Sequence, residues 1–198
     1  MKRLGISVEG ATEREFVSRV LRPYLLAFDC QVSAVDIRGN VSLDKIRGIL
    51  PALLGSFDRV STFYDFYGFK ARENRSVETL EFAIGNLAPK PDKHRIIPYV
   101  QRYEFEALLF AVPDYTAEWL QGTSDQIKEM QNAVKVCGSP ELVNDSVETS
   151  PSHRLIKLFP RYDKKLHGPE IIELAGLEII REHCPRFNQW LNQLENLQ

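Results

Sequence analysis

Carboxylate residues stand where two predicted strands end, and these acids are the residues of the chain best suited to chemistry. Glu9 follows a largely apolar segment, and Glu13 lies four residues later, in the first turn of the next predicted helix. Asp65 ends a second segment, rich in β-branched and aromatic residues. Because neighbouring strands lie about 4.8 Å apart, these carboxylates could share a divalent cation. Hard oxygen ligands suit Mg²⁺ or Mn²⁺ better than zinc.

A structural interpretation of the first two acids competes with the metal site. In it, Thr12 caps the helix, Glu15 completes a capping box, and Glu13 is a solvated acid of the first turn. We accept the capping role for Glu15. For Glu9 and Glu13 we favour a functional role, because a strand end in a packed sheet is a poor place for an unpaired charge. Gly10 is expected to take backbone angles that a side chain forbids.

Two further acids and several basic residues could complete the site. Glu104 and Glu106 follow the fourth predicted strand, and an α-helix would place them about 200° apart, so only one is expected to face the site. The choice between them stays open, and two solvent-facing acids are the structural alternative. Lys164 is the basic residue expected to act in catalysis, through its charge near a phosphoryl group. A solvated basic loop explains Lys164 and the other phosphate candidates, Arg154, Lys157, Lys165 and His167, equally well. His153 and His167 are also candidates for a general acid or base.

Composition favours one α/β domain with a helical addition. The chain has 198 residues and a net charge of −2, so nucleic acid would have to be bound by local basic patches or a metal. Its three cysteines are far apart in the sequence, which implies neither a disulfide framework nor a zinc site. No apolar run is long enough to cross a membrane and no signal peptide precedes the first strand, so we expect a cytoplasmic protein.

Strands and helices alternate along the first half of the chain. This alternation predicts a parallel four-stranded sheet flanked by helices, with Glu9 and Asp65 at the carboxyl ends where such sheets bind ligands. Pro98 places the fourth strand at an edge or interrupts it. The strands are expected near residues 3–9, 31–37, 59–65 and 95–100, and the helices near 12–28, 42–54 and 76–88.

The second half is predicted to be helical. We expect an α/β domain over residues 1–102 and a helical extension over 103–198, packed across the carboxyl end of the sheet. Residues 122–150 are polar and are interpreted as a mobile stretch, a candidate lid, with a short helix near 127–134. Trp190 is expected to hold the C-terminal helix on the core.

Two motifs carry a resemblance to a known domain. Val-Glu-Gly-Ala-Thr-Glu at 8–13 and Phe-Tyr-Asp-Phe-Tyr-Gly at 63–68 resemble the Toprim domain of topoisomerases, primases and overcoming-lysogenization-defect (OLD) nucleases. The Glu-Gly-x-Thr-Glu form is most similar to the OLD type. Nearly the whole chain, including 103–110 and 150–187, resembles DUF4276, a family of small bacterial proteins of unassigned function. Those proteins are regarded as Toprim-like and often accompany ATPases in defence-type gene neighbourhoods.

The resemblance implies a Toprim-like (Rossmann-like) sheet and roles for individual acids. It makes Glu9 a metal ligand and acid/base, Glu13 the second acid, and Asp65 the first aspartate of an Asp-x-Asp pair. Glu106 resembles the later acid of OLD-type domains. Tyr67 stands where the second aspartate is expected, so one metal ligand is missing and two-metal catalysis is not implied.

Two functions are therefore expected. The first is a Mg²⁺- or Mn²⁺-dependent nuclease or related phosphoryl-transfer enzyme acting on DNA or RNA, in a phage-defence setting. The second is a non-catalytic, degenerate Toprim partner of an ATPase encoded nearby, binding nucleic acid or nucleotide. A weaker third is an acidic crevice for a phosphorylated small molecule. The sequence leaves open DNA against RNA, activity without a partner, and the oligomeric state, a homo-oligomer included.

Overall fold

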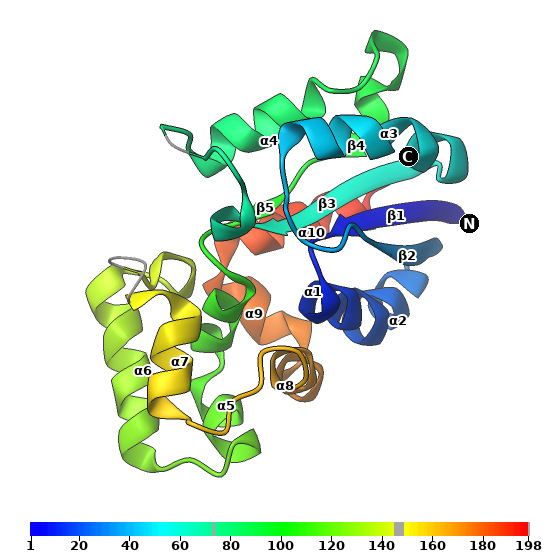
Figure 1. Cartoon of the computed structure of the whole chain (residues 1–198). Coiled ribbons are helices and arrows are strands. Elements are labelled where there is room, and N and C mark those ends of the chain that lie inside the picture. The colour runs from blue at the N-terminus through cyan, green and yellow to red at the C-terminus, as the bar shows by residue number, and fades with distance from the viewer. Residues whose placement is uncertain (73, 145–148, 198) are drawn as a thin grey trace.

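Five parallel strands form one sheet in the computed structural model, which describes residues 1–72, 74–144 and 149–197 (Figure 1). The strand order is β2-β1-β3-β4, and β5 also pairs with β3. Val8 is paired with Phe63, so β1 and β3 are neighbours and leave the sheet side by side. The strands are β1 (Lys2–Val8), β2 (Cys30–Asp36), β3 (Arg59–Asp65), β4 (Ile96–Ile97) and β5 (Val100–Gln101).

The predicted fourth strand is split into β4 and β5, and Pro98 lies at the break, as expected. Proline has no N–H with which to continue a strand ladder. Thr62 bridges the gap, because its hydroxyl donates to the carbonyl of Tyr99 and accepts from the N–H of Tyr99, both at 2.9 Å. Both β4 and β5 therefore remain paired with β3, so the sheet extends as far as the acids.

Helices cover both faces of the sheet, which confirms the predicted α/β class (Figure 1). One face carries α3 (Leu43–Ser56) and α4 (Val77–Gly85), which contribute to the two clusters formed with β3. The other carries α1 (Ala11–Phe16), the π-helical turn η1 (Val17–Leu21) and α2 (Arg22–Leu26). Short 3₁₀ helices connect the elements at η2 (Phe66–Gly68) and η3 (Lys90–Arg95).

The second half is helical, as predicted, within the range that the structure covers. In Figure 1 the helices from α5 to α9 lie beyond the carboxyl ends of the strands, and α10 returns along the sheet. The indole N–H of Trp190 on α10 donates to Ser61 Oγ of β3 at 2.9 Å. The elements are η4 (Phe105–Ala111), α5 (Pro113–Trp119), α6 (Ser124–Cys137), η5 (Pro140–Leu142), α7 (Pro151–Leu158), α8 (His167–Ala175), α9 (Leu177–His183) and α10 (Pro185–Glu195).

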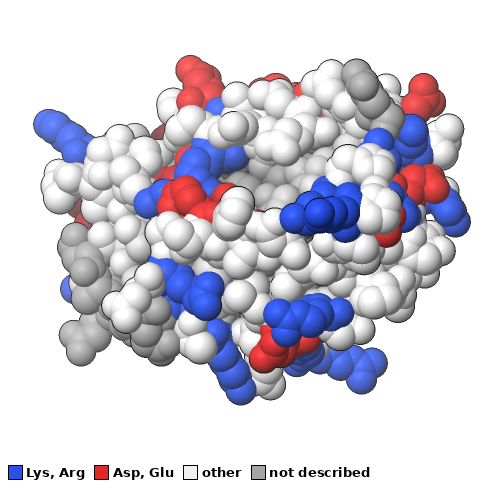
Figure 2. Space-filling model, turned by 90° about the horizontal axis from the view of Figure 1, so that it is seen from above, with Lys and Arg blue, Asp and Glu red and all other residues white. Residues whose placement is uncertain are grey.

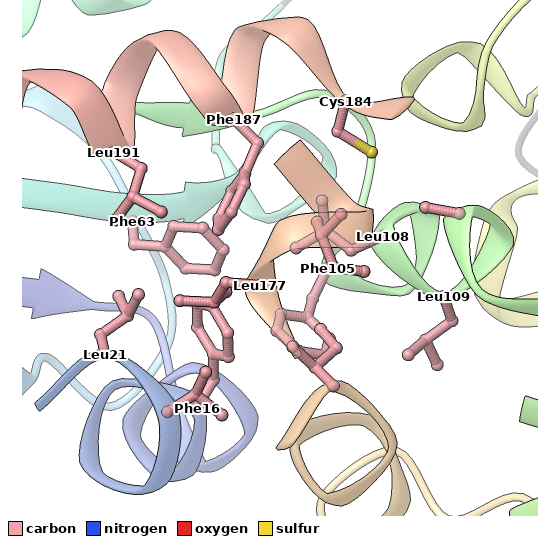
Figure 3. Packing of buried hydrophobic residues seen from close by; sticks show 14 of the residues in the cluster. Phe16, Leu21, Phe63, Phe105, Leu108, Leu109, Leu177, Cys184, Phe187 and Leu191 are labelled. Carbon is pink, nitrogen blue, oxygen red and sulfur yellow. The ribbon is translucent and has the colours of Figure 1, made fainter. Parts of the chain in front are cut away.

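One hydrophobic cluster joins the two halves of the chain (Figure 3). Phe16 of α1 packs against Phe63 of β3, Phe105 of η4 and Phe187 of α10, with ring centroids 5.4–6.2 Å apart. The boundary between residues 102 and 103 stays a prediction, because this cluster draws on both sides of it. None of the described helices is both long and apolar enough to span a bilayer.

Several element boundaries differ from the predicted ones. The first helix contains a π turn just before Pro23, which lacks the N–H for an α-helical bond to the preceding turn. Helix α3 continues to Ser56, past its predicted end at residue 54, and α4 ends at Gly85, before its predicted end at residue 88. The short helix expected near 127–134 is the longer α6, whose 14 residues include the fully buried Met130. Residues 145–148 of the stretch interpreted as mobile lie outside the described chain.

Candidate active site

Glu9 follows the last residue of β1, and its carboxylate is turned into the protein. The carbonyl of Glu9 accepts a 2.7 Å bond from the N–H of Gly39, which fixes the backbone there. Its Oε2 atom is buried and has no hydrogen-bond partner among the described residues. A Cβ atom on Gly68 would lie 1.8 Å from this oxygen. Glycine at position 68 thus leaves the space that the Glu9 carboxylate fills.

Glu13 is buried, with 6% of its surface exposed, and it binds the start of its own helix. The N–H of Gly10 donates to Glu13 Oε2 at 3.0 Å. The assignment of the cap to Thr12 and Glu15 is therefore wrong: the helix begins at Ala11, which makes Glu13 its third residue. The expectation for Gly10 is also wrong, because its φ of −160° is extended backbone that any residue adopts.

Asp65 ends β3 beside Glu9, so the pairing of β1 with β3 brings together the two acids that the sequence analysis placed at strand ends. Its Oδ1 atom is buried and, like Glu9 Oε2, has no partner among the residues described. Burial raises the pKa of Asp65 well above its usual value, and the negative charges of the other acids, Glu13 first, raise it further. A second anion at this strand end is costly without a cation.

Burial also raises the pKa values of the first two acids, Glu9 and Glu13. It raises the pKa of Glu9 to about 7; the charge of Glu13 adds to the shift, while Lys164 and Lys45 oppose it. Burial raises the pKa of Glu13 as well, against the effect of its bond from Gly10. Both shifts mean that the metal-free site resists holding all its carboxylates as anions near neutral pH.

Glu104 and Glu106 both face the site, and the expectation that only one could do so is wrong. The ammonium of Lys164 lies 3.6 Å from Glu104 Oε1 and 3.8 Å from Glu106 Oε1. Glu104 precedes the 3₁₀ helix η4 and has extended backbone angles, φ −142° and ψ 158°. The 200° separation of an α-helix therefore does not apply to this pair. The alternative of two solvent-facing acids is excluded, since Glu106 is only 3% exposed.

Glu104 and Glu106 accept hydrogen bonds from the helical half of the chain. The N–H of Ser152, at the start of α7, donates to Glu104 Oε2 at 2.9 Å, and Tyr162 donates to Glu106 Oε1 at 3.5 Å. Burial alone would raise the pKa of Glu104. The hydrogen bonds from Ser152 and the charge of Lys164 outweigh this effect, so the pKa of Glu104 is lowered. Burial raises the pKa of Glu106 to about 7, with Lys164 opposing the shift. The five acids thus divide into two that form ion pairs with Lys164, Glu104 and Glu106, and three that form no ion pair with the described residues.

Glu9, Glu13 and Asp65 have the type of ligand atom that a hard cation prefers, although their carboxylates are not already arranged around one point. In the described part of the chain, no three His, Cys, Asp or Glu side chains form a ready set of metal ligands. The donors are nevertheless all carboxylate oxygens, which Mg²⁺ and Mn²⁺ prefer. Two of these oxygens, Glu9 Oε2 and Asp65 Oδ1, are buried and unpartnered. The residues therefore fit a cation held chiefly by Glu9 and Asp65.

Comparison with known families gives one result. The model of a family described as a domain of unknown function, DUF4276, matches residues 8–195. The chain belongs to this family. Neither the search of curated proteins nor the search of solved structures gave a match. The match begins just before Glu9 and includes all five acids and Lys164, so the site lies within the matched range.

Thr12 connects the first motif of the DUF4276 chain to the loop that carries Lys164. Its hydroxyl donates to the carbonyl of Lys164 at 3.2 Å, across 152 positions of sequence. Thr12 is thus not a helix cap but a contact between the N-terminal motif and the segment before α8. The Lys164 side chain keeps 43% of its surface exposed, so its ammonium borders both the acids and solvent.

The other basic candidates make contacts elsewhere. His153, Arg154 and Lys157 line a separate cavity of about 130 Å³ with Glu129. The Nδ1 atom of His167 accepts a 3.0 Å bond from the N–H of Asp163. The N–H of Lys165 donates to the carboxylate of that aspartate at 2.8 Å. Of the basic residues singled out from the sequence, Lys164 is the one that forms ion pairs with the acids.

Three further residues shape the site and were not identified from the sequence. Gly68 had a signal, because it closes the segment around Asp65 much as Gly10 follows Glu9. No sequence pattern pointed to Ser152 or Tyr162, since they are about 50 positions from the acids that they bind. Only the folded chain shows that α7 and the loop before α8 bring hydrogen-bond donors to Glu104 and Glu106.

Proposed function

We propose that this DUF4276 chain is a Mg²⁺- or Mn²⁺-dependent phosphoryl-transfer enzyme acting on nucleic acid, in its simplest form a nuclease. The observation that carries the proposal is the pair of buried, unpartnered oxygens, Glu9 Oε2 and Asp65 Oδ1, at neighbouring strand ends. Burying such oxygens without a partner is costly, and a divalent cation would provide one. The order of the strands and the two motifs support a Toprim-like sheet as the finer description of the fold.

Within this proposal each acid has a distinct task. Glu9 and Asp65 would hold the cation, and Glu13 would add negative charge beside them while keeping its bond to Gly10. A bound Mg²⁺ or Mn²⁺ would polarise a phosphodiester and activate water. Glu106, with a pKa of about 7, can take up or release a proton near neutral pH.

Lys164 would provide a second positive charge. Its distances of 3.6 and 3.8 Å from Glu104 and Glu106 are longer than a strong charged hydrogen bond, so the ammonium can approach a phosphoryl oxygen. This supports one metal ion with a lysine rather than two metal ions, in keeping with Tyr67 at the second aspartate position. Glu104 and Glu106 would then orient the lysine instead of binding metal.

A non-catalytic partner of an ATPase is the second candidate function, and Tyr67 favours it. Its hydroxyl accepts from the side-chain amide of Asn144, so position 67 provides a ring and a neutral hydrogen bond where a metal ligand is expected. The net charge is also mildly negative, which gives no overall attraction to nucleic acid. The face of the molecule over α3 and α4 carries charges of both signs around an uncharged middle (Figure 2). A defence setting and an ATPase partner belong to both candidate functions.

The test is cleavage by wild type and by Glu9→Gln and Asp65→Asn, which keep size but remove the charge a cation needs. Single- and double-stranded DNA and RNA are incubated with Mn²⁺ or with chelator, alone and with any ATPase encoded beside the gene. We expect metal-dependent cleavage by wild type and none by either variant. Stability should be unchanged or slightly higher in both, because acid–acid repulsion is relieved.

Two results would count against the proposal. Cleavage that persists in both variants would reject Glu9 and Asp65 as the site. No metal binding and no cleavage by wild type under any of these conditions would favour the non-catalytic partner.

A further inference from the structure

Two tyrosines lie beside the acids but are not part of the hydrophobic core. Tyr67 lies two residues after Asp65, and Tyr103 directly precedes Glu104. Their rings are 5.6 Å apart at 45°, and both side chains are half-buried. Neither belongs to the hydrophobic clusters that the described residues form. Stability of the core therefore does not explain why two aromatic rings are held at this end of the sheet.

Tyr103 is held in a backbone conformation that is unfavourable for its side chain. Its φ is +65°, a left-handed value that is uncommon for bulky residues. The carbonyl of Tyr103 accepts a 3.0 Å bond from the N–H of Tyr67, which ties the turn after β5 to η2. Strain of this kind persists where the surrounding structure enforces it, and it is concentrated at functional sites.

One side of the tyrosine pair is already covered. The guanidinium of Arg72 lies 5.2 Å from the centre of the Tyr67 ring and donates to the carbonyl of Tyr67 at 3.2 Å. Tyr67 is thus supported by Arg72 and its neighbours, whereas the Tyr103 ring has Tyr67 as its aromatic contact.

We propose that Tyr103, supported by Tyr67, is a stacking site for an unpaired nucleobase next to the acids. The proposal rests on the proposed function and narrows its substrate to single-stranded nucleic acid or to unpaired ends and loops. Base stacking on an aromatic ring is tolerant of sequence, and the bases of a duplex have their faces already occupied.

Binding, measured without turnover, tests this inference separately from cleavage. The probe is a short single-stranded DNA with one 2-aminopurine, whose fluorescence falls on stacking, in buffer with Ca²⁺ in place of Mg²⁺. Tyr103→Leu removes the ring and Tyr103→Phe keeps it. Tyr103→Asn also removes the ring but tolerates a positive φ, so it covers the case in which the leucine variant does not fold. Phe82→Leu, at a ring 76% exposed on α4, is the matched control.

We expect Tyr103→Leu and Tyr103→Asn to weaken binding about tenfold and to lose the fluorescence change, as for loss of one stacked base. Tyr103→Phe and Phe82→Leu should stay within about twofold of wild type. Wild-type affinity in both ring-less variants, equal losses in Tyr103→Phe and Tyr103→Leu, or no single-strand binding by wild type would overturn the inference. Cleavage by wild type with unchanged binding in the ring-less variants rejects the stacking site alone. Ring-dependent binding without cleavage rejects the enzyme alone.

Discussion

At the scale of single residues, the site depends on pairs of residues in contact, where each residue limits which side chain the other position can hold. Glu9 and Gly68 form one such pair, because the carboxylate occupies the volume that any side chain at position 68 would need. Lys164 with Glu104 and Glu106 is another, because one ammonium offsets two acids. The sequence located all of these charged residues but not their pairing. Pairing depends on contacts between segments that are about 60 positions apart in the sequence.

Gly68→Ala is expected to displace the Glu9 carboxylate. The added methyl group would overlap Glu9 Oε2, so we expect a loss of about 1–3 kcal/mol in the free energy of unfolding and much weaker Mn²⁺ binding. Urea unfolding and calorimetric titration measure the two effects. Gly48→Ala in helix α3 is the control: a Cβ atom added at position 48 would meet nothing within 4 Å, so this variant should be neutral or stabilise by up to about 1 kcal/mol. Equal behaviour of the two variants would contradict the packing of Glu9 on Gly68.

Lys164→Met distinguishes an acid pair that orients a lysine from one that binds metal. Without the ammonium, the pKa of Glu106 should rise further, since Lys164 now opposes its shift. We expect cleavage to fall sharply and its pH profile to move to higher pH, while one Mn²⁺ per chain still binds. Lys165→Met, at the exposed neighbour, should leave both unchanged. A second Mn²⁺ bound by Lys164→Met would show that Glu104 and Glu106 are metal ligands.

At the scale of elements, the alternation of strands and helices predicted the sheet well. Strands β1, β2 and β3 lie within about one residue of their predicted bounds, because apolar runs and turn residues mark both ends. The π turn before Pro23 and the 3₁₀ helix η4 were not predicted, since no simple periodicity signals them. The second of these misses caused the error over Glu104 and Glu106, which shows that an element's type decides which side chains share a face.

Helix α10 is an element whose contribution can be measured. Trp190 is 2% exposed, stacks on Tyr99 with centroids 4.6 Å apart, and donates to Ser61. We expect Trp190→Ala to lower the free energy of unfolding by about 3–5 kcal/mol in urea. Phe82→Ala removes an exposed ring and should cost less than about 0.5 kcal/mol. A Trp190→Ala effect as small as that of Phe82→Ala would mean that α10 does not stabilise the sheet.

At the scale of the whole molecule, the two halves meet around the acids. The sequence predicted that the helical half would pack across the carboxyl ends of the strands, where open α/β sheets bind their ligands. It also predicted, through Trp190, that the C-terminal helix packs back on the core, which the bond from Trp190 to Ser61 confirms. It did not predict that the cluster around Phe16 would join both halves. Such long-range packing depends on complementary shapes, which hydrophobic patterns do not specify.

The free energy of unfolding of the metal-free protein should depend on pH through the buried acids. Glu9 and Glu106 have a pKa of about 7 when folded and about 4.5 when unfolded. Between these values the folded state binds more protons, so stability should fall as pH rises from about 5 to 8. Mn²⁺ should reverse the loss at pH 8 because it binds the anionic form. Urea unfolding at both pH values, with chelator and with Mn²⁺, measures this; metal-free stability that rises with pH would contradict the assignment.

The most direct measurement of the central claim is a crystal structure of the protein soaked in Mn²⁺, with anomalous diffraction to locate the ion. The proposed site predicts one Mn²⁺ coordinated by Glu9 and Asp65, with Glu9 Oε2 and Asp65 Oδ1 among its ligands and Lys164 still beside Glu104 and Glu106. Absence of Mn²⁺ between Glu9 and Asp65 at saturating concentration, with Lys164 moved in to neutralise them, would contradict it.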